Sequence, residues 1–78
     1  MNVIVKNGTF GKNLLFLRKK YRLSRIALAK LTGTAAVLIC AWEEGRVYPT
    51  LSSEMVKRLC VILQVDRNTL LSTDLEAE

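Results

Sequence analysis

Cationic side chains dominate the first half of the sequence, and they are the residues best suited to bind a ligand. Up to Trp42 there are eight Lys and Arg and no acid, whereas from Glu43 onward there are four bases and seven acids. The two parts carry +8 and −3, which sum to the net charge of +5. This asymmetry is typical of a face that binds a polyanion, although a solvated basic helix gives the same count.

Groups for catalysis or metal binding are missing from the sequence. There is no histidine and no phosphate-binding glycine loop, and no Ser or Cys has a visible base partner. Cys40 and Cys60 lack the paired spacing of a zinc site, so we expect reduced, partly buried thiols. We therefore expect no catalytic residue, no cofactor and no metal, and the protein is not expected to be an enzyme.

Hydrophobic residues make up half of the sequence, which is too many for a disordered chain. The longest apolar run, Ala35 to Trp42, is far shorter than the roughly 20 residues that a membrane-spanning helix needs. Met1 to Lys6 lacks the long apolar stretch of a secretory signal. We therefore expect a cytoplasmic protein with no membrane partner.

Apolar residues recur at helical spacing in segments that are short enough for one small domain. Phe10, Leu14, Leu17 and Tyr21 mark one face of the first segment. The pattern predicts five helices: 10–21 (or 12–21), 25–32, 35–44, 53–63 and 67–71.

Capping residues predict where these helices begin and end. Ser24, Ser52 and Asp66 are suitable N-caps for the second, fourth and fifth helices. Gly33 supplies the positive φ that a sharp turn between the second and third helices needs, and Gly45 is a natural stop for the third.

The two ends of the chain differ from the helical part. Val3 to Val5 is a β-favouring run before the turn signal Asn7-Gly8, and it suits either a strand paired with a second copy or an unstructured arm. The last residues are polar. We therefore divide the chain into an N-terminal arm (1–9), a helical domain (10–71) and a flexible tail (72–78).

Two short helices joined by a glycine turn carry a resemblance to a known family. The sequence resembles the phage-repressor family of the Cro and CI type, also called XRE, over about 12–71. The matching positions are Leu23-Ser24, Leu28-Ala29, Gly33, Ile39, Trp42-Glu43 and Gly45, with Leu63, Val65 and Leu70-Leu71 as the closing segment. The resemblance implies an all-α, five-helix lambda-repressor-like helix-turn-helix domain that binds double-stranded DNA as a transcriptional regulator.

The resemblance also implies roles for particular cations. Arg25, the residue after the second helix's cap, and Arg46, in the loop after the third helix, are expected to contact the DNA backbone. Lys30 is expected to extend this positive rim. Arg18 and Glu43 match a family pair that links the first helix to the end of the third, although two unrelated surface charges remain an alternative.

The third helix departs from the family at the positions that read bases. The outward residues are expected to be Ala35, Ala36, Val37, Leu38, Cys40 and Ala41, and none is a strong hydrogen-bond former. One interpretation is DNA binding through phosphates, with thymine methyl groups as the only base contact. A second is a protein contact through Val37, Leu38 and Cys40, for example in a homodimer. A third is a rotated helix, or one covered by the N-terminal arm.

Overall fold

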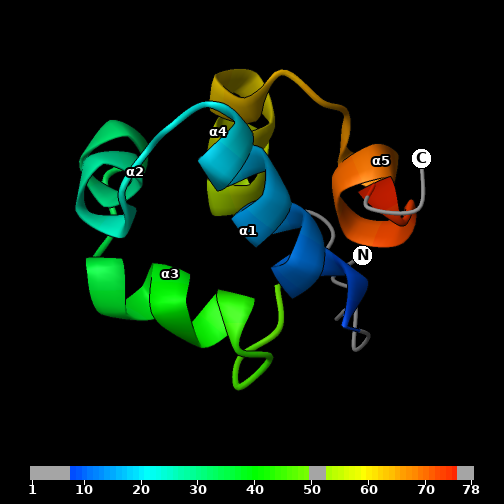
Figure 1. The fold of residues 1–78 in the computed structure, drawn as a ribbon, viewed down its shortest axis with the longest axis horizontal. Helices are drawn as coiled ribbons and strands as arrows, with labels where there is room; N and C mark the ends of the chain where they lie inside the picture. Colours follow the sequence, from blue (N-terminus) through cyan, green and yellow to red (C-terminus); the bar gives the residue numbers. More distant parts are fainter. Residues whose placement is uncertain (1–7, 50–52, 76–78) are drawn as a thin grey trace.

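Five helices make up the part of the chain that the computed structural model describes, residues 8–49 and 53–75. No strand occurs in these residues, so the all-α prediction is confirmed there, whereas the predicted arm strand at 3–5 lies outside them. In Figure 1, α1 lies in the middle of the view and α3 below it, with α2 at one side and α5 at the other. The helices are α1 (Thr9–Lys20), α2 (Arg25–Thr32), α3 (Ala36–Glu43), α4 (Glu54–Leu63) and α5 (Arg67–Ser72).

Side-chain caps start three of the helices. The Ser24 hydroxyl accepts from the Ala27 N–H at 3.0 Å, and an oxygen of Asp66 accepts from the Thr69 N–H at 2.7 Å. The fourth helix begins one residue later than predicted, because Ser53 and not Ser52 caps it, accepting from the N–H of Met55 at 3.1 Å. The third helix begins at Ala36, because Ala35 is extended and has no side chain that could cap it.

Left-handed residues end four of the helices. Gly33 and Gly45 have φ of 73° and 75°, as their predicted roles at the ends of α2 and α3 require. Arg22 and Gln64 have φ of 57° and 60° after α1 and α4, and nothing in their residue types predicts this conformation. After α2 and α4 the chain turns back at once, and the next helix, α3 or α5, packs against the one before it.

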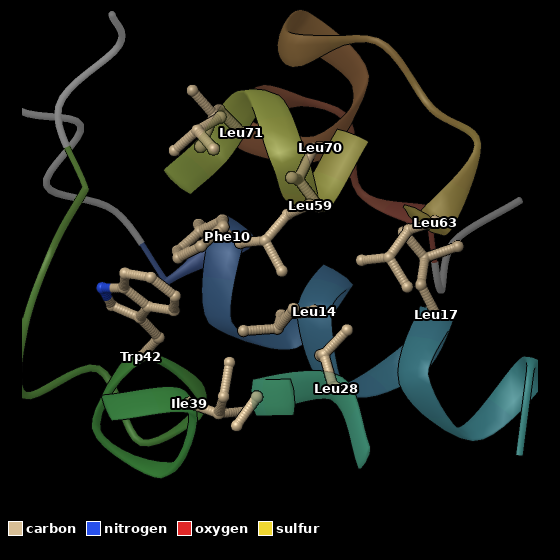
Figure 2. Close-up of a cluster of buried hydrophobic side chains, with 12 residues drawn as sticks. Phe10, Leu14, Leu17, Leu28, Ile39, Trp42, Leu59, Leu63, Leu70 and Leu71 are labelled. Atoms are coloured by element: carbon tan, nitrogen blue, oxygen red, sulfur yellow. The ribbon is translucent and has the colours of Figure 1, made fainter. Parts of the chain in front are cut away.

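The core forms where α1 meets the other helices (Figure 2). The predicted inward residues Leu14, Leu28 and Ile39 are fully buried. Trp42 is 5% exposed and meets the Phe10 ring edge-to-face, with the ring centroids 5.6 Å apart. Trp42 is therefore part of the core. The other fully or nearly fully buried side chains are Leu17, Val56, Leu59, Leu63, Leu70 and Leu71.

One buried amide ties α1 to α5. The Asn13 Nδ2 donates to the carbonyl oxygens of Thr69, Leu70 and Thr73 at 3.2, 2.8 and 2.6 Å. Its Oδ1 accepts from the Leu75 N–H at 3.1 Å, and the Leu75 side chain packs against the core. Contacts with α1 therefore continue past the predicted domain boundary at residue 71. The division into arm, domain and tail itself stays a prediction.

Candidate nucleic-acid interface

Helices α2 and α3 form a sharply bent pair. Their axes turn by 112° across the short connection at Gly33, within the range that two helices of a helix-turn-helix adopt. No single described helix is long and apolar enough to cross a membrane. Only α2 and α3 taken together reach that length and apolar composition, and they are bent by 112° where they join.

An arginine of α4 braces the connection between α2 and α3. The Nη1 of Arg58 donates to the carbonyl oxygen of Thr32 at 3.3 Å, at the last residue of α2. The Thr32 hydroxyl is buried and donates back to the Leu28 carbonyl at 2.8 Å. The turn is therefore held by contacts within α2 and by a contact from α4. No local pattern in the sequence predicts this role of Arg58.

A close backbone contact sets the distance between α1 and α3. A β-carbon at Gly11 would lie 2.5 Å from the carbonyl oxygen of Trp42 and 3.0 Å from that of Glu43. Only glycine permits this approach, because both neighbouring atoms are backbone and cannot turn aside. Gly11 was not predicted to matter, since its role depends on residues more than 30 positions away in the sequence.

A buried carboxylate fixes the end of α3 to α1. The Arg18 Nε donates to Glu43 Oε2 at 2.6 Å and its Nη2 donates to Oε1 at 3.2 Å. The two side chains are 12% and 2% exposed. Arg18 also donates to the Leu23 carbonyl at 3.0 Å, which holds the segment between α1 and α2. The two residues of the predicted pair thus lie together, with the geometry of a two-point ion pair.

Arg25 is the third member of this cluster. Its Nε donates to Glu43 Oε1 at 3.0 Å, and its side chain is 44% exposed. The hydrogen bond from Arg25 to Glu43 raises the pKa of the Arg25 guanidinium above its ordinary value, and the charge of Glu43 acts in the same direction. The residue predicted to contact phosphate is therefore anchored to the end of α3, which the sequence did not predict.

The outward surface of α3 is apolar at its N-terminal end. Ala35 is exposed, Val37 is 71% exposed, and Cys40 is half-buried. Ala36, also expected to face outward, is half-buried because part of its side chain packs against the core. The Cys40 thiol donates to Oε2 of Glu44 at 3.0 Å, so its one donor is occupied. Both cysteines are free, half-buried thiols, as predicted. This end of α3 presents methyl groups and no strong hydrogen-bond donor.

Two residues that were expected to face outward do not. Leu38 is half-buried and packs against the core, since it lies one turn before the buried Trp42. Ala41 is 6% exposed. After α3 the chain turns back, and the Arg46 N–H donates to the Ala41 carbonyl at 2.9 Å. Neither residue is available to read bases.

The remaining predicted cations lie at the surface. Arg46 is 58% exposed and its Nε donates to Oε1 of Glu44 at 2.8 Å. Lys30 is exposed on α2, and within residues 8–49 and 53–75 no acid pairs with it. Val47 and Tyr48, 42% and 39% exposed in the loop after α3, were not predicted as part of the surface. The end of α3 is thus a mixed cluster of cations around Glu43 and Glu44, not a purely positive rim.

Comparisons with known proteins agree with this geometry. A family model described as a helix-turn-helix domain matches residues 11–76. The fold is similar to that of the P22 c2 repressor protein, solved in complex with the synthetic operator 9T. The identity is 29%, the TM-score is 0.78, and the match covers 87% of this chain and 100% of that chain. It is also similar to the restriction-modification controller protein C.AhdI from Aeromonas hydrophila, with 27% identity, a TM-score of 0.71, and coverage of 81% and 92%.

More distant similarities concern the fold alone. A transcriptional regulator from Vibrio cholerae shares 24% identity at a TM-score of 0.72, and this chain covers 38% of its length. Hydroxypropylphosphonic acid epoxidase from S. wedmorenis shares 24% identity at a TM-score of 0.70, and this chain covers 35% of it. A search of curated proteins found no match. The family match over most of the sequence is decisive, and the chain belongs to the helix-turn-helix family of the Cro and CI repressor type.

Proposed function

We propose that this protein is a transcriptional regulator that binds double-stranded DNA, with α3 in the major groove. The observation that carries the proposal is the α2–α3 pair, which turns by 112° and leaves Ala35 and Val37 at the start of α3 exposed. A helix in this position fits the width of the major groove. The P22 c2 repressor, whose whole length this chain covers, was solved with an operator DNA bound.

Phosphate contacts supply most of the binding energy in this proposal. Arg25 and Lys30 lie on α2, Arg46 lies three residues after the end of α3, and all three side chains are exposed. Arg46 shares an exposed ion pair with Glu44, and such pairs contribute little, so a phosphate can replace the carboxylate. Binding through these contacts is strongly salt-dependent and only weakly selective among sequences.

A salt titration of duplex binding tests this proposal. Fluorescence anisotropy of a labelled DNA duplex, measured at increasing KCl concentration, gives log K against log salt. Each phosphate contact contributes a slope of about −0.9, so contacts from three cations predict about −2.7 per domain. Arg46→Ala should reduce the slope by about one contact. Failure of the wild-type protein to bind any duplex at low salt would exclude the proposed function.

Base selection in this proposal comes from methyl groups. The surface that α3 presents early in the helix consists of Ala35, Ala36, Val37 and the half-buried Cys40. Among the major-groove features of the bases, only the thymine 5-methyl group suits such an apolar surface. Val37 is the largest exposed side chain there, and we assign to it the main base contact.

Replacing thymine by uracil removes this methyl group and changes no hydrogen-bonding group. The wild-type protein should bind an A·T duplex more tightly than its A·U counterpart, by about fourfold per contacted methyl, which corresponds to about 0.8 kcal/mol. Val37→Ala should lose most of this preference while keeping the same salt slope. Equal binding of the two duplexes by the wild type would show that α3 does not read methyl groups.

A protein contact through α3 is the second candidate function. The 71% exposure of Val37 favours it, because exposed apolar side chains often lie at interfaces. The same surface would then join two copies in the absence of DNA. Light scattering of the wild type and Val37→Glu at high concentration separates the two candidates. A wild-type dimer that Val37→Glu dissociates would support the interface, whereas monomers in both would exclude self-association through α3.

A further inference from the structure

One carboxylate receives hydrogen bonds from arginines of two different helices. Glu43, the last residue of α3, binds Arg18 of α1 through both of its oxygens. The same Oε1 that accepts from Arg18 Nη2 also accepts from the Nε of Arg25, the first residue of α2. The Glu43 side chain is 2% exposed, whereas that of Arg25 is 44% exposed. The cluster is therefore buried on the Arg18 side and open to solvent on the Arg25 side.

The geometry leaves most donors of Arg25 available. A guanidinium carries five N–H donors, and the contact with Glu43 uses the one on Nε. No acceptor within residues 8–49 and 53–75 takes a hydrogen bond from Nη1 or Nη2 of Arg25. Because Nε is held by Glu43, the opposite edge of the planar group, formed by the two Nη atoms, is the edge presented to solvent.

The start of α2 also leaves two amide donors without a partner inside the helix. Ser24 accepts through its hydroxyl from Ala27 and through its carbonyl from Leu28. The amide N–H groups of Arg25 and Ile26 come earlier in the helix and have no acceptor in the preceding turn. A guanidinium edge and the free amides of a helix N-terminus are each suited to bind phosphate oxygens.

We propose that Glu43 is a positioning residue for Arg25, holding its guanidinium side-on so that the Nη edge binds a DNA phosphate. The inference rests on the proposed function and adds a mechanism to it. Because Glu43 ends α3, the carboxylate places the phosphate contact at a fixed position relative to the helix in the major groove. Arg18 holds the carboxylate, so the chain of contacts runs from α1 through α3 to α2 and then to DNA.

The opposite mechanism is competition, in which Arg25 must leave Glu43 before it can reach DNA. The two mechanisms predict opposite effects of removing the negative charge. If Glu43 positions Arg25, Glu43→Gln weakens DNA binding. If Glu43 competes with phosphate, Glu43→Gln frees Arg25 and strengthens binding.

Duplex binding of five proteins across a KCl series distinguishes these mechanisms. The proteins are the wild type, Arg25→Ala, Glu43→Gln, the double variant, and Lys19→Ala as a control. Lys19 carries the same charge, is exposed near the end of α1, and lies outside the two helices of the motif. Arg25→Ala should reduce the magnitude of the salt slope by about 0.9, and Glu43→Gln should reduce it by a similar amount. The double variant should show no larger reduction in slope than either single variant. Lys19→Ala should leave the slope unchanged.

Other results of this experiment would contradict the positioning role of Glu43, the phosphate contact of Arg25, or DNA binding itself. Unchanged or tighter binding by Glu43→Gln overturns positioning, as does a double variant whose losses simply add. An unchanged slope in Arg25→Ala, with normal binding by the wild type, ends this inference and leaves the proposed function intact. No binding by the wild type at low salt ends both.

A second variant covers the case in which Glu43→Gln does not fold. Arg25→Lys keeps the charge and leaves the α1–α3 pair in place, but a lysine cannot bind Glu43 with one edge and phosphate with another. It should bind DNA more weakly than the wild type at every salt concentration. Equal affinity of Arg25→Lys and the wild type would mean that charge alone matters, and would overturn the proposal.

Discussion

Gly11 in α1 lies so close to Trp42 in α3 that a β-carbon on it would be 2.5 Å from the Trp42 carbonyl oxygen. Within a helix, glycine to alanine normally increases stability by about 0.5–1 kcal/mol. At this position we expect the reverse, because the backbone of α3 must move away. Gly11→Ala should lower the free energy of unfolding by about 1–3 kcal/mol, measured by urea denaturation.

Gly8 provides the matched control for this substitution. A β-carbon on Gly8 has nothing within 4 Å, and its φ of −75° suits any residue. Gly8→Ala should therefore leave stability nearly unchanged. If Gly11→Ala is as stable as the wild type, α1 and α3 can move apart at little cost, contrary to the close packing of their backbones.

Asn13 is expected to be essential for the attachment of α5 to α1. Asn13→Leu keeps a similar size but leaves the carbonyl oxygens of Thr69, Leu70 and Thr73 without this donor. Unsatisfied buried polar groups cost about 1–3 kcal/mol each, so we expect a loss of at least about 2 kcal/mol in the free energy of unfolding. Asn68→Leu, at an exposed position of α5, should change it by less than about 0.5 kcal/mol. Equal effects of the two substitutions would contradict this role of Asn13.

The Arg18–Glu43 pair should contribute far more to stability than the exposed Arg46–Glu44 pair. Arg18→Met leaves the buried Glu43 carboxylate with only Arg25, and breaking a buried pair from one side costs about 3–5 kcal/mol. Because Arg25 still pairs with Glu43 in this variant, we expect a loss in the free energy of unfolding near the lower limit of this range. Arg46→Met removes an exposed partner and should cost about 0–1 kcal/mol. Thermal denaturation of both variants measures the difference, and indistinguishable melting temperatures would refute it.

Acid should weaken the fold in part through Asp66. The backbone hydrogen bond from Thr69 holds the pKa of the Asp66 carboxyl below its ordinary value of 3.8, and a side-chain hydrogen bond from Thr69 acts in the same direction. Because the folded-state pKa is depressed, the stabilisation is present above pH 3.8 and is lost as the pH falls through the folded-state pKa.

Asp66→Asn should remove this part of the acid response. Asparagine also caps helices but does not titrate. The free energy of unfolding, followed by urea denaturation from pH 5 to pH 2, should therefore fall less steeply in Asp66→Asn than in the wild type. Parallel curves for the two proteins would show that the cap does not titrate with folding.

Local sequence signals predicted most of the fold. Ser24, Asp66, Gly33 and Gly45 act within one helical turn of their own positions, so their residue types were sufficient to place the caps and ends. The fourth helix shows the limit of this reasoning, since Ser52 and Ser53 are chemically equal and only the backbone decides that Ser53 is the cap.

The contacts that position the candidate site were less predictable. The roles of Gly11 and Asn13 depend on backbone atoms far away in the sequence, and a single sequence carries no signal for these. Ala41, which was expected to face outward, is buried, and the spacing of apolar residues in the sequence did not predict this. Arg25 was identified from its place after a helix cap, but its bond to Glu43 required the three-dimensional arrangement.

The hydrogen bonds of Asn13 have a consequence for how the protein opens. They join residues separated by 56 to 62 positions, so α1 and the segment 69–75 cannot separate without breaking them. Amide hydrogens in the middle of α1 and in α5 should therefore exchange with solvent through one shared opening event. The helix that supports α3 thus unfolds cooperatively with the last described part of the chain, although neither α5 nor Leu75 contributes to the candidate DNA-binding surface.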